Sequence, residues 1–289
     1  MTSSASGPGT TVTDWERAEI DRANASGLTP VVFVHGLWLL SSSWQGWRDR
    51  FEEAGYTTLA PGWPDDPPTV EEAYRDPSVF ARKMVQGVTD HFLDAISSLE
   101  NKPAVIGHSF GGLIAQKIAD EGASVATVAI DNAPIKGVLP LPASALKSGS
   151  AVIGNPANRG RAIALTFDQF KYGWANNLDE VEARQLYDTY HVPASGAPLF
   201  QAALANFNPF GGETAVDVKN PQRGPLLIIA GTNDNTAPIA FTHGTYTHQA
   251  KNEGVTEYAE VEDRGHSLII DHGWPEVADL AVAFIKRFA

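Results

Sequence analysis

The chain has 289 residues, a formal net charge of −13 and no cysteine. An acidic surface repels nucleic acid and anionic membranes, so we expect neither as a partner and favour a small-molecule substrate. The lack of cysteine excludes disulfides, thiolate metal sites and cysteine nucleophiles.

Residues 1–13 are rich in Ser, Gly and Thr and are expected to form a disordered tail. They lack the basic start and apolar centre of a secretory signal, and no apolar run approaches the roughly 18 residues that would span a bilayer. We therefore expect a cytoplasmic protein.

The apolar pattern predicts helices and strands in alternation. In chain order we expect a helix at 14–25, a strand at 30–34, a helix at 43–54, a strand at 56–60, a long helix at 78–99, strands at 103–106, 125–130, 226–230 and 256–261, and a closing helix at 274–288. The strands are continuously apolar, which is typical of a parallel sheet covered by helices on both faces. The predicted class is α/β.

The strand rhythm stops between residues 134 and 225, and this segment is rich in Phe, Tyr and Trp. It could complete the core, but we favour a helical cap over the site, because ligands of open α/β sheets bind at the carboxyl ends of the strands. The predicted organisation is a core made of residues 14–133 and 226–289, with a cap at 134–225.

One short motif carries the strongest chemical signal. Gly107-His108-Ser109-Phe110-Gly111 lies between the predicted strand at 103–106 and a further predicted helix at 112–119, which is the setting of a nucleophile elbow. A serine on such a tight bend holds its hydroxyl clear of the backbone, and the flanking glycines prevent clashes. Ser109 is therefore the predicted nucleophile.

The motifs together resemble the α/β-hydrolase superfamily. The resemblance rests on His35-Gly36 after the first strand, the elbow at Ser109, Asp234 after a late strand and His266 near the C-terminus, in the order serine, acid, histidine. Within it, the chain looks most like lid-bearing small esterases and cofactor-free chloroperoxidase-like enzymes. The first two strands of the family's sheet have no clear counterpart before residue 30.

The resemblance implies a catalytic triad. A serine needs a base to take its proton and an acid to orient that base, and we assign these roles to His266 and Asp234. His272 is the alternative base. Asp131, at the end of the strand after the elbow, is the alternative acid.

The same resemblance implies an oxyanion hole made by the backbone N–H groups of Leu37 and Phe110. Trp38, Trp44 and Phe207 are the predicted substrate-binding side chains. For His35 we favour a structural role that holds the loop. No cofactor and no metal site are expected.

The predicted function is hydrolysis of neutral, apolar carboxylic esters or lactones through an acyl-Ser109 intermediate. One alternative uses the same triad for perhydrolase or haloperoxidase-like, carbon–carbon hydrolase or lyase chemistry. Another is a non-catalytic binding protein for small molecules.

Overall fold

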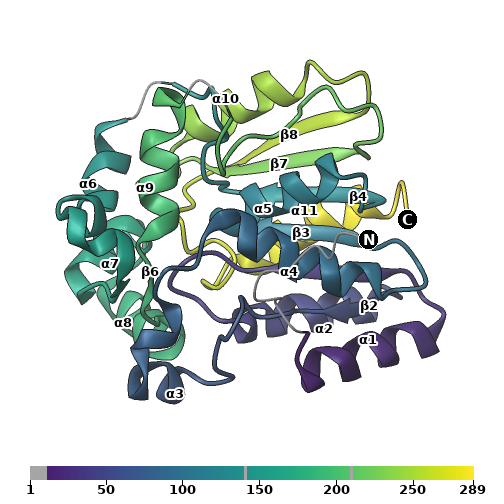
Figure 1. Ribbon diagram of the computed structural model, residues 1–289, viewed down its shortest axis with the longest axis horizontal. Coiled ribbons are helices and arrows are strands. Elements are labelled where there is room, and N and C mark those ends of the chain that lie inside the picture. The colour runs from purple at the N-terminus through teal and green to yellow at the C-terminus, as the bar shows by residue number, and fades with distance from the viewer. Residues whose placement is uncertain (1–11, 140–141, 209–210) are drawn as a thin grey trace, which may run out of the picture.

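A six-stranded parallel sheet forms the centre of the structure, a computed structural model that describes residues 12–139, 142–208 and 211–289 (Figure 1). The strand order is β2-β1-β3-β4-β7-β8, and every pair of neighbours is parallel. The strands are β1 (Pro30–Val34), β2 (Thr57–Leu59), β3 (Ala104–His108), β4 (Ala126–Ile130), β7 (Leu226–Gly231) and β8 (Thr256–Val261). The predicted α/β class is confirmed.

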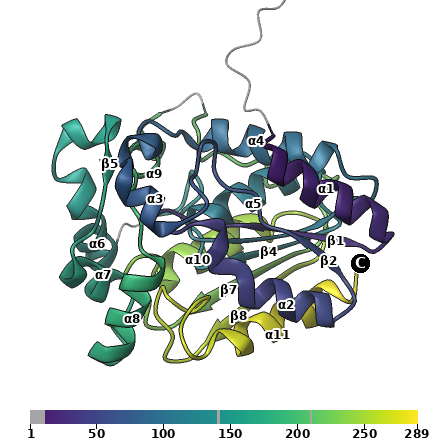
Figure 2. The ribbon, with the colours of Figure 1, turned by 90° about the horizontal axis from the view of Figure 1, so that it is seen from below.

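Helices cover both faces of this sheet (Figure 2). One face carries α2 (Gln45–Glu53) and α11 (Trp274–Ile285), and the other carries α1 (Asp14–Ser26), α4 (Val85–Ser97) and α5 (Phe110–Asp120). The remaining core helices are α3 (Val70–Arg75) and α10 (Ile239–Gln249). Four central strands, β1, β3, β4 and β7, are buried at every residue because both faces are covered.

An insertion between β4 and β7 gathers at one end of the sheet (Figures 1 and 2). It contains α6 (Ala143–Ile153), a short helix at Pro156–Gly160, β5 (Ala162–Ile163), α7 (Phe167–Gly173), α8 (Glu180–Tyr190), β6 (Ala194–Ser195), α9 (Ala197–Leu204) and a short helix at Ala205–Phe207. It occupies the place predicted for the cap. Of the predicted cap, residues 140–141 and 209–210 lie outside the described residues.

Two local predictions need correction. The predicted tail extends too far, because Thr13 already caps α1: its hydroxyl accepts from the Glu16 N–H, and the Glu16 side chain accepts from the Thr13 N–H. Residues 1–11 of that tail lie outside the described residues. The helix predicted at 78–99 begins only at Val85, because Arg82 lies in the left-handed region at φ 63° and interrupts it.

The sheet begins at β1, and residues 12–29 contain α1 and no strand. The lack of counterparts for the family's first two strands is therefore confirmed over these residues. No helix in the described ranges has both the length and the apolar character needed to cross a bilayer.

Candidate active site

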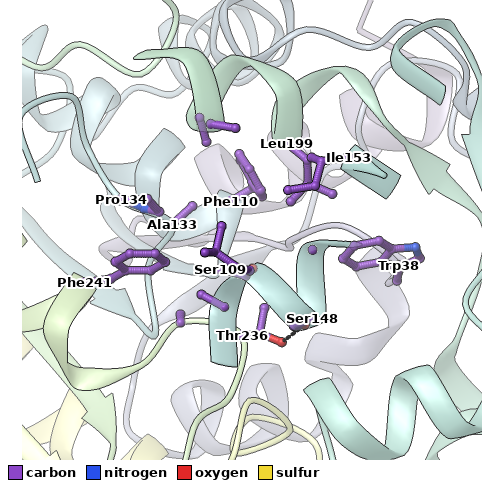
Figure 3. A pocket seen from close by; sticks show the side chains of 16 residues that line it. Trp38, Ser109, Phe110, Ala133, Pro134, Ser148, Ile153, Leu199, Thr236 and Phe241 are labelled. Atoms are coloured by element: carbon purple, nitrogen blue, oxygen red, sulfur yellow. Dashed lines mark hydrogen bonds between the residues drawn. The ribbon is translucent and has the colours of Figure 1, made fainter. Parts of the chain in front are cut away.

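Ser109 lies on a strained turn between β3 and α5. Its backbone has φ 58° and ψ −123°, which a non-glycine residue rarely adopts. A side chain at Gly107 would collide with the carbonyl of Gly111, and one at Gly111 would collide with the carbonyl of Val34. The two glycines therefore permit the turn, and Ser109 lines a pocket at the start of α5 (Figure 3).

His266 and Asp234 are joined by a hydrogen bond. His266 follows β8 and Asp234 follows β7, and His266 Nδ1 lies 2.6 Å from Asp234 Oδ2. The other carboxylate oxygen, Oδ1, accepts from the N–H groups of Thr236 (2.6 Å) and Ala237 (2.8 Å). Because Nδ1–H donates to the carboxylate, Nε2 of the neutral ring carries the lone pair that can accept a proton.

The His266 ring is fully buried next to the elbow. Its centroid lies 4.5 Å from that of the His108 ring, on the residue before Ser109, and 4.6 Å from that of the Trp174 ring. His266 Nε2 makes no hydrogen bond to any described residue. Burial, and then the neighbouring His266, lower the pKa of His108 well below its usual range, so His108 is neutral.

Asp131, the alternative acid, lies at the end of β4 and is fully buried. Its Oδ1 accepts one N–H bond, from Gly231 (2.8 Å). Burial, and then the charge and side-chain contact of Asp234, raise the pKa of Asp131 well above its usual range. Of the two acids, Asp234 is the one whose side chain is bonded to His266, through Oδ2.

The alternative base does not join this group. The side chain of His272 is about two-thirds exposed, and its Nδ1 lies 2.9 Å from both carboxylate oxygens of Glu182 on α8. It does not line the pocket that contains Ser109.

The loop after β1 passes close to Ser109 at Gly36. A Cβ atom at Gly36 would lie 2.7 Å from Ser109 Cβ, so the glycine permits this approach. The N–H groups of Leu37 and Phe110 find no acceptor among the described residues. Both amides are thus available to an oxyanion formed beside Ser109.

Polar contacts hold this loop from behind. His35 Nδ1 donates to the Gly36 carbonyl (2.9 Å), and His35 Nε2 lies 3.2 Å from Asp66 Oδ2. Asp66 also forms an ion pair with Lys83, and the Trp63 indole donates to the His35 carbonyl (3.0 Å). All these side chains are buried, which supports the structural role expected for His35.

The pocket above Ser109 has a volume of about 90 Å³ and apolar walls (Figure 3). Helices α6 and α9 form one side, and the loops after β1, β3, β4 and β7 form the other. None of the described lining residues is charged: Trp38, Ser109, Phe110, Ala133, Pro134, Ala145, Leu146, Ser148, Gly149, Ile153, Leu199, Ala202, Ala203, Thr236, Ala237 and Phe241.

Only one of the three predicted substrate-binding side chains lines this pocket. Trp38 does, and its indole N–H donates to the Ile163 carbonyl of the insertion (2.9 Å). Trp44 does not, because it is fully buried under the sheet, with its ring centroid 5.1 Å from that of Phe33. Phe207 does not either, because it is 81% exposed on the outside of the insertion.

Sequence reasoning did not identify the pocket walls on α6 and α9, or Ser148 and Thr236. These residues belong to no motif, and only packing of the insertion against the core brings them to Ser109. Asp66 and Lys83 were missed for the same reason.

Among the described residues, one group of three possible metal ligands lies together. Ligand atoms of His108, Asp131 and His266 are within 4.8 Å of one another, and all three residues are buried. His266 is already bonded to Asp234, and Asp131 faces Asp234. We therefore interpret the group as the surroundings of the His266–Asp234 pair.

Solved structures with the same fold include several hydrolases. A monoacylglycerol lipase from Paleococcus ferrophilus is 20% identical, with a TM-score of 0.60 over 90% of this chain and 95% of that one. An extracellular α/β-hydrolase from a Paenibacillus species is 19% identical (TM-score 0.63, 88% and 98% covered). Polyneuridine aldehyde esterase is 15% identical (TM-score 0.62, 90% and 99% covered). At these identities the likeness concerns the fold alone.

A comparison with curated protein sequences found no match. The narrower resemblance to lid-bearing esterases and chloroperoxidase-like enzymes stays a prediction. The model of the alpha/beta hydrolase family matches residues 31–280, which is most of the sequence. The chain therefore belongs to the alpha/beta hydrolase family.

Proposed function

We propose that the protein hydrolyses carboxylic esters of neutral, apolar small molecules through an acyl-Ser109 intermediate. The observation that carries the proposal is the 2.6 Å hydrogen bond between His266 and Asp234, buried beside the elbow that holds Ser109. This arrangement supports a serine nucleophile with an oriented base, which the chemistry of acyl transfer requires.

In the first half of the reaction, His266 Nε2 takes the proton of Ser109 as the hydroxyl oxygen attacks the ester carbonyl. The negative charge that develops on the carbonyl oxygen is stabilised by the N–H groups of Leu37 and Phe110. His266 then gives its proton to the departing alcohol, and the acyl group remains on Ser109. Asp234 stabilises the imidazolium that forms in between.

In the second half, water attacks the acyl-serine while His266 accepts one of its protons. Collapse of the second tetrahedral intermediate releases the carboxylic acid, and the proton returns to Ser109. The apolar, uncharged pocket supports a neutral substrate, because a buried charge without a partner is costly to desolvate.

Ser109→Ala tests the proposal. We expect the wild type to hydrolyse 4-nitrophenyl butyrate, and the variant to lose about a thousandfold or more of kcat/KM with unchanged thermal unfolding. A fluorophosphonate probe should label the wild type and should not label Ser109→Ala. Ser97→Ala is the matched control, because the exposed Ser97 hydroxyl only donates to the Asp94 carbonyl on α4.

Retention of more than a hundredth of the activity in Ser109→Ala would overturn the assignment. An assay with and without hydrogen peroxide separates hydrolysis from perhydrolase chemistry. A wild type that neither hydrolyses esters nor reacts with the probe would favour a binding protein instead.

A further inference from the structure

Two hydroxyl groups meet in the wall of the Ser109 pocket (Figure 3). Ser148 belongs to α6 of the insertion, and Thr236 belongs to the loop after β7 that also carries Asp234. Their oxygens lie 2.7 Å apart. Among the described residues that line the pocket, four have polar side-chain atoms: Trp38, Ser109, Ser148 and Thr236. The Trp38 indole N–H is already bonded to the Ile163 carbonyl.

The direction of the hydrogen bond between them is fixed by a third group. Thr236 Oγ1 lies 2.8 Å from the carbonyl oxygen of Gly173, the last residue of α7. A carbonyl can only accept, so the Thr236 hydroxyl proton is committed to Gly173. Thr236 must then accept the proton of Ser148.

The Ser148 oxygen is left with unused lone pairs. A hydroxyl has one proton and two acceptor positions, and Ser148 uses its proton on Thr236. No donor among the described residues reaches this oxygen. At the pocket wall, Ser148 therefore presents an acceptor and no donor.

The positions of Ser148, Thr236 and Gly173 are fixed by close packing and by hydrogen bonds. A Cβ atom at Gly173 would lie 2.6 Å from Ser148 Oγ and 2.9 Å from Thr236 Oγ1, so only glycine permits both hydroxyls to approach. The Thr236 backbone is fixed in turn, because its N–H donates to Asp234 Oδ1 (2.6 Å). Reversal of the hydrogen-bond direction would cost the bond to Gly173.

We propose that Ser148 is a specificity-determining residue that selects esters whose apolar part carries a hydroxyl group. The proposal rests on the proposed function, because the pocket is the one that contains Ser109. A substrate hydroxyl can donate to the Ser148 oxygen. An ether oxygen at the same place would bring two acceptors together without a proton, and a hydrocarbon would leave the Ser148 oxygen without a partner.

The test compares matched aromatic esters. Methyl phenylacetates place the ring in the acyl part, and benzyl acetates place it in the alcohol part. Each is made with hydrogen, hydroxyl or methoxy at the ortho, meta or para position. We expect kcat/KM for the hydroxyl compound to exceed that for its methoxy partner about tenfold in at least one series and position, as one net hydrogen bond allows.

Two variants test the cause of this ratio. Ser148→Ala should bring it to within about twofold of one, because the acceptor is gone. Thr236→Val should also lower it, because it frees the Ser148 proton to meet an ether oxygen. Ser150→Ala is the matched control on the same helix and should keep the ratio, since the exposed Ser150 hydroxyl donates to the Lys147 carbonyl.

Binding measurements keep this proposal separate from the proposed function. In Ser109→Ala protein, calorimetric Kd values for the same compounds should show the same hydroxyl preference, even if the wild type hydrolyses none of them. The proposal is overturned if no series prefers the hydroxyl in either measurement, or if the preference persists in Ser148→Ala.

Discussion

Replacement of Asp234 by Asn tests the proposed acid most directly, because the structure fixes how the new amide would lie. Oδ1 of Asp234 accepts two backbone N–H bonds, from Thr236 and Ala237. The amide oxygen of Asn must take this place, since an NH₂ group cannot accept them. The NH₂ group is then directed at His266 Nδ1, where Oδ2 now lies at 2.6 Å.

This amide would force the wrong tautomer of His266. Nδ1 would have to accept from the NH₂ group, so Nε2 would carry the proton and could no longer take one from Ser109. A substitution of this kind in a serine protease lowers kcat about 10⁴-fold, which is about 5 kcal/mol in the barrier. We expect a loss of this order here.

Asp131→Asn should have a far smaller effect. Burial and Asp234 raise the pKa of Asp131, which favours the neutral form of its carboxyl, and an amide has nearly the same shape as that form. The amide oxygen can accept from the Gly231 N–H, as Oδ1 does now, while NH₂ donates toward Asp234. We expect kcat to stay within about threefold of wild type, since no hydrogen bond of the His266–Asp234 pair is lost.

The assay is steady-state hydrolysis of 4-nitrophenyl butyrate by the two variants and the wild type, with circular dichroism to verify folding. The reasoning is refuted if Asp234→Asn retains more than a hundredth of wild-type kcat. A larger loss in Asp131→Asn than in Asp234→Asn would move the acid to Asp131.

Three further outcomes are expected. Neutral esters should have a higher kcat/KM than carboxylate-bearing esters of similar size, because no charged residue in the described ranges lines the pocket. A preference for the anionic ester would contradict the expectation of an uncharged pocket. Gly36→Ala should lower kcat about a hundredfold or more, since its Cβ would lie 2.7 Å from Ser109 Cβ and displace the loop after β1 that carries the Leu37 N–H. Unchanged kcat in a folded variant would exclude that loop from the mechanism. Burial lowers the pKa of His191 from 6.5 to about 4, so between these pH values the unfolded chain binds a proton that the folded chain does not, and stability should fall as pH falls through this window. The neutral His191 ring accepts from the Leu165 N–H, and His191→Gln should flatten this part of the curve in urea unfolding; an unaltered slope would refute the assignment.

The elements of the core could be predicted because each has a local cause. The strand at Pro30–Val34 is continuously apolar, and Gly107 is required by the turn itself, because a side chain there would collide with the carbonyl of Gly111. The wrong bounds predicted for the tail and for the helix at 78–99 also have local causes, which composition does not reveal. Arg82 adopts a left-handed conformation that delays α4, and Thr13 forms a cap three residues before its partner Glu16.

The pocket residues were harder to predict, because aromatic character does not distinguish a core residue from a pocket wall. Trp38 and Trp44 lie six residues apart in the same segment. Trp38 bonds to the insertion and lines the pocket, whereas Trp44 packs on Phe33 under the sheet. Whether each ring reaches the pocket or the core depends on the path of the chain after β1.

By itself, the sequence determined the α/β class, the elbow at Ser109, and the candidates Asp234 and His266, because short-range patterns and backbone constraints encode them. Only the tertiary structure decided between Asp234 and Asp131 as the partner of His266, since that choice depends on which carboxylate lies within hydrogen-bond reach of a ring 32 positions away from Asp234 in the sequence. It alone also brought Ser148 to Thr236, 88 positions away, because the packing of the insertion on the core is a sum of many weak contacts that no motif records.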